Sequence, residues 1–330
     1  MTQIVPYIRG RGLFGALVLL SALVLFVPHP AHADCRIQRK ASLPITIDAG
    51  HPLVQASING HSVNLLLDTG AQGSLVTPGT VAHLGLPRDR QRTTDLRGIG
   101  GSVSSQNALI HNFAVAGSEY LDMSVGISSL PASDRTDGLI GADILSVYDL
   151  DLDFPGRMLT LYNVSGCERI VPGWDRPYAT LPAHLLSRLL LVKVEIDGHP
   201  LNTLFDTGGP EAMLSRAAMP LVGLGDRDLA LDPPGESRGI GARRTPSRLH
   251  RFAVVRIGAE IFRNVSVHVA EFHQVQANML LGLDYMLGRR FWLSYATRTV
   301  FIQQPARAAQ PATTWGNANS ALSPQGGSVR

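Results

Sequence analysis

The 330-residue sequence has few charged residues and no dense basic cluster. Charged residues make up 17% of it, and the formal net charge is +3. Residues 34–304 contain 25 basic and 26 acidic side chains, and Arg243-Arg244 is an isolated basic pair that we interpret as solvated. Binding to nucleic acid requires a concentrated basic face. We therefore expect no nucleic-acid partner.

Motifs of metal and serine chemistry are also missing. The sequence has no HExxH, and His268 and His273 do not have the i, i+4 spacing that places two ligands on one helical face. It has no GxSxG, the turn that presents a serine nucleophile in α/β-hydrolases. We expect neither a metal nor another cofactor.

No hydrophobic run reaches the length of a membrane span. The longest run, Leu13–Val27, is too short for one; it follows two arginines and precedes Ala31-His32-Ala33. This order is typical of a secretory signal peptide with small residues at its cleavage site. We predict a signal peptide over residues 1–33, a mature chain from Asp34, and a periplasmic or secreted protein that leaves the membrane after cleavage. The alternative is an uncleaved membrane anchor.

Only two cysteines are present, Cys35 and Cys167. An exported chain enters a compartment in which a cysteine pair can oxidise. Neither cysteine belongs to a nucleophile or metal pattern. We predict a structural disulfide between them.

The sequence contains an internal duplication. Ile58-Asn59-Gly60-His61 returns in the second half of the chain as Ile196-Asp197-Gly198-His199. Four more blocks recur in the same order and at nearly the same offset. The first members of these pairs are Leu66-Leu67-Asp68-Thr69-Gly70, Arg97-Gly98-Ile99-Gly100, His111-Asn112-Phe113-Ala114-Val115 and Leu139-Ile140-Gly141-Ala142-Asp143; the second members are Leu204-Phe205-Asp206-Thr207-Gly208, Arg238-Gly239-Ile240-Gly241, His250-Arg251-Phe252-Ala253-Val254 and Leu280-Leu281-Gly282-Leu283-Asp284.

Each repeat carries the pattern of short β-strands. Runs rich in Leu, Val and Ile end in Asn-Gly or Asp-Gly, which are strong hairpin signals. We therefore predict two all-β units, residues 34–170 and 171–304, followed by a disordered tail, 305–330. The expected strands are 53–58, 150–154 and 158–162 in the first repeat, and 189–196, 292–295 and 299–302 in the second.

The repeated Asp-Thr-Gly suggests a pair of carboxylates. Asp68 and Asp206 each follow an apolar strand at equivalent places, so a two-fold arrangement of the repeats can bring them together. Two carboxylates about 3 Å apart share one proton and titrate as a pair. Such a pair supplies a general base and a general acid at once.

The two Asp-Thr-Gly motifs, each with a downstream apolar pair and glycine, resemble the aspartic proteases of the pepsin and retropepsin group. The resemblance covers about residues 34–304. It implies two homologous closed β-barrel lobes related by a pseudo-two-fold axis, with a cleft between them. It further implies that Thr69 and Thr207 hydrogen-bond across the axis, and that Gly70 and Gly208 allow close approach to the carboxylates.

The same resemblance assigns flap hairpins to the glycine-rich segments. Gly98, Ile99 and Gly100 would form one flap. The second repeat departs from the family at Gly209-Pro210-Glu211, so we expect its loop geometry to differ. Glu211 would line the substrate cleft, although a surface glutamate is equally compatible with the sequence. The second flap would contain Gly239, Ile240 and Gly241.

Taken together, these features predict a monomeric, exported aspartic endopeptidase that acts on peptide or protein substrates with an Asp68/Asp206 dyad. One alternative is a peptide-binding pseudoprotease of the same fold, which Gly209 and Pro210 favour. Another is a glycosidase, which also uses two carboxylates but does not need Thr-Gly beside both of them.

Overall fold

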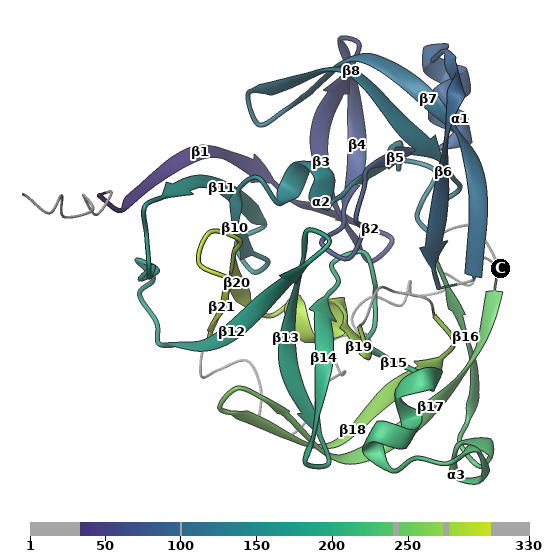
Figure 1. Ribbon diagram of the computed structural model, residues 1–330, viewed down its shortest axis with the longest axis vertical. Coiled ribbons are helices and arrows are strands. Elements are labelled where there is room, and N and C mark those ends of the chain that lie inside the picture. The colour runs from purple at the N-terminus through teal and green to yellow at the C-terminus, as the bar shows by residue number, and fades with distance from the viewer. Residues whose placement is uncertain (1–33, 100, 240–243, 273–276, 305–330) are drawn as a thin grey trace, which may run out of the picture. The chain divides into compact units, whose positions relative to one another are not determined.

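Strands make up most of the computed structural model, which describes residues 34–99, 101–239, 244–272 and 277–304. The strands form two sheets, one of 13 strands and one of eight (Figure 1). No described helix is long and apolar enough to span a bilayer. The mostly β architecture predicted from the sequence is confirmed.

A tight hairpin delivers the aspartate in each repeat. β3 (His51–Ile58) and β4 (His61–Leu67) pair around Asn59-Gly60, whose φ angles are 50° and 83°. Positive φ at both central residues defines the type I′ turn, which Asn-Gly favours because both residues tolerate it. The equivalent elements of the second repeat are β13 (Leu189–Ile196), the Asp197-Gly198 turn and β14 (His199–Phe205).

A short parallel strand lies beside each aspartate strand. β9 (Gly138–Ile140) pairs with β4, and β19 (Met279–Leu281) pairs with β14. Both are fully buried and apolar, as expected for strands covered on both faces. Each is followed by one turn of helix, α2 (Ala142–Leu145) or α4 (Leu283–Met286).

Long antiparallel hairpins complete each repeat. In the first, β6 (Arg88–Gly98) pairs with β7 (Gly101–Val115), which pairs with β8 (Ser118–Ile127). The second repeat has the same order in β16 (Pro234–Arg238), β17 (Arg244–Ile257) and β18 (Glu260–Ala270). The smaller elements are β2 (Thr46–Asp48), β5 (Leu75–Val76), α1 (Pro78–Leu84), β15 (Met213–Ser215), the 3₁₀ helix η1 (Arg216–Val222) and α3 (Asp226–Ala230).

Six strands from both repeats form one continuous part of the larger sheet. Their order is β1-β11-β10-β20-β21-β12, so the first repeat supplies three neighbouring strands and the second supplies the other three. The bounds are β1 (Arg36–Pro44), β10 (Asp149–Asp153), β11 (Met158–Ser165), β12 (Tyr178–Leu186), β20 (Arg290–Ser294) and β21 (Thr299–Gln303).

The repeats meet in this sheet at a local two-fold axis. Asp151 of β10 pairs with Trp292 of β20, and these two residues have the same separation in sequence as Leu139 and Leu280 of the repeated block. Trp292 is thus the second-repeat equivalent of Asp151, and the two equivalent residues face each other across the axis. Arg290 donates to both carboxylate oxygens of Asp151, at 2.8 and 2.6 Å, and Trp292 Nε1 donates to Asp149 Oδ2 at 3.1 Å.

Aromatic packing also joins the two repeats. The ring of Phe291 lies 6.5 Å from Phe154 of the first repeat and 5.5 Å from Phe205 of the second, edge to face in both cases. Both repeats contribute to one large buried cluster. At the outer edge of the shared sheet a disulfide joins Cys35 to Cys167, beside the Arg36–Ser165 pair of β1 and β11.

Candidate active site

Both Asp-Thr-Gly motifs begin where a buried strand ends. Asp68 follows β4, and its backbone N–H donates to Ile140 O at 3.1 Å. Asp206 follows β14, and its N–H donates to Leu281 O at 3.0 Å. The parallel strands β9 and β19 therefore fix the start of both loops in the same way.

Thr69 and Thr207 hold the two loops together through four buried hydrogen bonds. The Thr69 N–H donates to Thr207 Oγ1 at 3.0 Å, and the Thr207 N–H donates to Thr69 Oγ1 at 3.2 Å. The Thr69 hydroxyl donates to Phe205 O at 2.6 Å, and the Thr207 hydroxyl donates to Leu67 O at 2.5 Å. Each hydroxyl is thus donor and acceptor across the two-fold axis, which leaves neither group unsatisfied.

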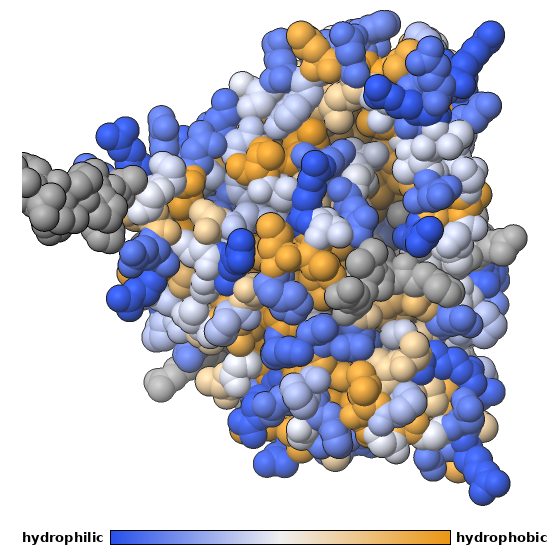
Figure 2. Space-filling model, in the orientation of Figure 1, coloured by the Kyte–Doolittle hydropathy of each residue, from blue (hydrophilic) through white to orange (hydrophobic). Residues whose placement is uncertain are grey.

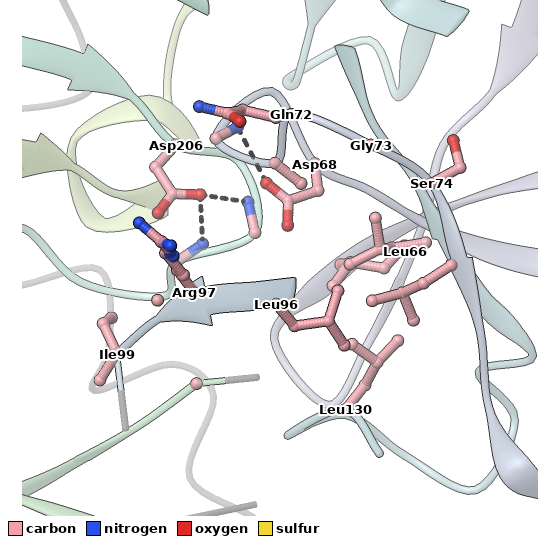
Figure 3. Close-up of a pocket in the computed structure, with 18 of the residues that line it drawn as sticks. Leu66, Asp68, Gln72, Gly73, Ser74, Leu96, Arg97, Ile99, Leu130 and Asp206 are labelled. Carbon is pink, nitrogen blue, oxygen red and sulfur yellow. Dashed lines mark hydrogen bonds between the residues drawn. The ribbon is translucent and has the colours of Figure 1, made fainter. Parts of the chain in front are cut away.

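The carboxyl groups of Asp68 and Asp206 lie side by side on the axis. They share a side-chain hydrogen bond, and the two residues are only 8% and 9% exposed. Each Oδ1 also accepts from its own loop, Asp68 from the Gly70 N–H at 2.9 Å and Asp206 from the Gly208 N–H at 3.0 Å (Figure 3). The Gly209 N–H adds a further loop bond to Asp206, at 3.1 Å.

This environment favours one shared proton. Burial raises the pKa of Asp68, and the neighbouring charge on Asp206 raises it further. Burial also raises the pKa of Asp206, while the N–H groups of Gly209 and Gly208 oppose that rise. The two carboxyl groups therefore titrate as a pair that contains one acid and one base.

Glycine is required on both sides of the pair because the loops touch reciprocally. A Cβ at Gly70 would lie 2.5 Å from Asp206 Oδ1, and a Cβ at Gly208 would lie 2.5 Å from Asp68 Cγ. Neither glycine is in the left-handed region. Their role here is close approach rather than an unusual backbone angle.

A second layer of contacts differs between the repeats. The Ser74 hydroxyl donates to Asp143 Oδ1 at 2.7 Å and accepts from the Gly141 N–H at 3.0 Å. In the second repeat Ala212 takes the place of Ser74, and its backbone N–H donates to Asp284 at 3.1 Å. Asp143 and Asp284 each end a copy of one repeated block, but the sequence alone indicated no role for either residue.

A cavity of about 560 Å³ lies over the carboxyl pair and is lined from both repeats. At one end, leucines of the first repeat gather, as Figure 3 shows for Leu66, Leu96 and Leu130. On the face drawn in Figure 2, hydrophobic residues gather toward the middle among hydrophilic ones. Three arginines also line the cavity: Arg97, Arg188 and Arg238.

The glycine-rich hairpins reach this cavity. Gly98, Ile99 and Gly239 line it, and Ile99 forms an antiparallel bridge with Phe272 of the second repeat. The backbone of Gly239 lies against Ile99, so closely that a Cβ there would overlap the Ile99 carbonyl. Gly100, Ile240 and Gly241 lie outside the described residues.

Glu211 forms an ion pair with His268, and its side chain is 43% exposed, as in the surface position that the sequence left open. Its carboxylate accepts from His268 Nε2 at 2.8 Å, and it is not among the described residues that line the cavity. This hydrogen bond lowers the pKa of Glu211 and raises the pKa of His268. The Glu211 side chain is thus held by His268 of β18.

The Gly209-Pro210 segment keeps the backbone support that the first repeat has. Besides the Gly209 N–H bond to Asp206, the Gly209 carbonyl accepts from the Leu283 N–H at 2.9 Å. The first repeat makes the equivalent bond from the Ala142 N–H to Ala71 O at 2.8 Å. The unusual sequence is therefore accommodated without loss of the supporting contact.

Comparison with known families agrees with this geometry. The family described as aspartyl protease matches the chain twice, over residues 54–144 and 192–285, which together make up more than half of it. No curated protein matches the chain. The two matched segments contain the two Asp-Thr-Gly loops and the strands that support them, and the chain belongs to the aspartyl protease family.

Proposed function

We propose that the chain is an exported endopeptidase that hydrolyses peptide bonds with water activated by Asp68 and Asp206. The observation that carries the proposal is the buried carboxyl pair, held on a two-fold axis by Thr69 and Thr207 and covered by a cavity with walls from both repeats. Because that cavity extends to both sides of the pair, it can take polypeptide on both sides of the scissile bond.

In the proposed reaction, the Asp206 carboxylate takes a proton from water as the water oxygen attacks the peptide carbonyl carbon. The Asp68 carboxyl group gives its proton to the carbonyl oxygen, which stabilises the developing charge. The tetrahedral intermediate then collapses when the proton on Asp206 passes to the amide nitrogen and the C–N bond breaks. A hydroxyl proton of the intermediate returns to Asp68, which restores the starting state.

Export is part of the proposal and rests on the N-terminal segment that precedes Asp34, which lies outside the described region. The Cys35–Cys167 disulfide supports it, because such bonds persist in oxidising compartments. Mass spectrometry of the exported protein tests it: the expected mature chain begins at Asp34, and a mass that retains the preceding segment contradicts cleavage.

We further propose that the protein acts as a monomer, since one chain supplies both carboxyl groups. Activity per chain should then be constant on dilution. Loss of activity at low concentration, with a dimer in sedimentation, would contradict an intrachain pair.

The decisive experiment incubates purified residues 34–330 with a mixed peptide library from acid to neutral pH. We expect cleavage with a bell-shaped rate profile belonging to the pair, and inactivity of both Asp68→Asn and Asp206→Asn. If the folded Asp206→Asn protein cleaves as fast as the wild type, the two-carboxylate mechanism is wrong. Peptide binding without turnover by the wild type would instead support the pseudoprotease alternative.

A further inference from the structure

Three arginines that line the cavity have no acidic partner among the described residues. Arg97 is near the end of β6, Arg188 is in the turn between β12 and β13, and Arg238 ends β16. All three are exposed, and none forms an ion pair or a side-chain hydrogen bond within the described part of the chain. They are therefore available to bind an anionic group that enters the cavity.

Outside the cavity the protein has arginines with an acidic partner and arginines, such as Arg251, with none among the described residues. Six of them lie within 4.0 Å of a carboxylate of this chain: Arg176, Arg216, Arg244, Arg256, Arg289 and Arg290. The guanidinium group presents several N–H donors in a planar fork that matches a carboxylate. The guanidinium groups that line the cavity have no partner among the described residues. They are therefore suited to bind a carboxylate of the substrate.

The acidic groups of the cavity lie mainly on its floor. Asp68 and Asp206 share a proton, and the Asp143 carboxylate already accepts from the Ser74 hydroxyl and the Ile144 N–H. Asp95 is the remaining acidic residue of the lining. Away from these three aspartates, the charged groups that a substrate side chain can contact in the cavity are three guanidinium groups and one carboxylate.

The duplication places two of these arginines symmetrically. Arg97 and Arg238 open equivalent copies of one repeated block, and each precedes the glycine of its hairpin tip, Gly98 or Gly239. In Figure 3, Arg97 lies on the Asp206 side of the cavity, away from Leu66 and Leu130. Since a peptide crosses the two-fold axis at its scissile bond, equivalent arginines lie on opposite sides of that bond.

We propose that Arg97, Arg188 and Arg238 select substrates with aspartate or glutamate on both sides of the scissile bond. This inference rests on the proposed peptidase function. Arg97 and Arg238 each bind an acidic side chain on one side of the bond, and Arg188 adds a third guanidinium group to the cavity lining. The leucine-lined end of the same cavity accepts an apolar side chain.

The test uses peptides matched except for glutamate or glutamine on one side of the cleaved bond, and compares their kcat/KM values. At about pH 6, where glutamate is ionised, we expect the glutamate peptide to be favoured by up to about fivefold for each arginine that it contacts. The preference should weaken with added salt and disappear below a pH of about 4, where glutamate is protonated.

Single variants assign the sides. Arg97→Gln should remove the preference on one side of the bond and Arg238→Gln the preference on the other, while Arg188→Gln should reduce the preference on one of the two sides. The matched control is Arg251→Gln: Arg251 is an exposed arginine of β17 that is not part of the cavity lining, and its substitution should leave the ratios unchanged.

Equal kcat/KM values for glutamate and glutamine peptides at every pH overturn this inference and leave the peptidase proposal standing. The same holds if a preference survives in all three cavity variants. If no peptide is cleaved, fluorescence anisotropy with the same labelled peptides decides the point. Tighter binding of the glutamate peptides, lost in the cavity variants, supports the arginine role even though catalysis has failed, and equal affinities overturn it.

Discussion

Gly70 of the first repeat lies directly against the carboxylate of Asp206 in the second, and Gly208 lies in the same way against Asp68. Alanine at either position would place a methyl group about 2.5 Å from the opposite carboxyl group. Because that carboxyl group is held by loop N–H donors, relief of the overlap must separate the pair.

We therefore predict that Gly70→Ala and Gly208→Ala each lower kcat/KM by at least about 100-fold, the scale of a misplacement of about 1 Å. Gly288→Ala is the matched control, since Gly288 is exposed and a Cβ there would meet nothing within 4 Å. Near-normal activity in Gly70→Ala would mean that the pair tolerates displacement.

The shared proton also predicts a cost in stability. Because burial raises the pKa of Asp68 above its usual 3.8, the folded state retains a proton that the unfolded state releases, and stability falls as pH rises above 3.8. Asp68→Asn removes this ionisation but keeps an oxygen to accept from the Gly70 N–H.

The Asp68→Asn protein should accordingly melt at a higher temperature than the wild type at about pH 7, and the difference should close as the pH falls toward 3.8. Its kcat/KM should drop by roughly 100- to 10,000-fold. Calorimetry and steady-state kinetics measure the two effects. Asp134→Asn, at an exposed position, should change neither; a destabilised Asp68→Asn protein at neutral pH would contradict the shared-proton account.

The threonine bonds that join the loops are predicted to be among the costliest to remove. Thr69→Val keeps the side-chain shape but leaves Phe205 O without its donor and the Thr207 N–H without its acceptor. We expect a loss of about 2–4 kcal/mol in the free energy of unfolding, measured by denaturant titration. Thr69→Ser, which keeps the hydroxyl and removes one methyl group, should cost only about 1 kcal/mol. If both variants lost the same free energy of unfolding, the contribution of Thr69 would come from packing rather than from its hydrogen bonds.

The Glu211–His268 pair predicts a pH window in stability. The raised pKa of His268 gives a contribution that is complete below 6.5 and is lost as the pH rises through the folded-state value. The lowered pKa of Glu211 gives a contribution that is complete above 4.5 and is lost as the pH falls through its folded-state value. The coupling between the two residues is thus largest between about pH 4.5 and 6.5.

A double-mutant cycle with Glu211→Gln and His268→Gln measures this coupling. Because Glu211 is 43% exposed, we expect no more than about 1 kcal/mol near pH 5.5, falling at alkaline pH. The Glu195–Arg256 pair is the control, since arginine remains charged and its coupling should not change from about pH 5.5 to 8.5. A Glu211–His268 coupling that is constant over the same range would contradict the assigned titration.

Local signals in the sequence were sufficient for the β-hairpins and for the repeated aspartates. Asn59-Gly60 predicts its turn because few other residue pairs accept positive φ at both positions. The pairing of β10 with β20 could not be predicted, because the pairing of strands far apart in sequence depends on packing across the whole sheet. The same limit applies to Glu211, whose side chain binds His268 far along the chain, and to Ser74, which supports the start of a distant helix.

Finally, the register of β10 and β20 bears on which chains can assemble with each other. β10 reads Asp-Leu-Asp-Leu-Asp, and its partner β20 offers Arg290 and the Trp292 indole N–H to those aspartates. Were the first repeats of two molecules to pair through this edge, Asp151 would face a second Asp151, with like charges directly opposed. The divergence of the two repeats at their axis therefore disfavours pairing between two first repeats and favours pairing of a first repeat with a second one.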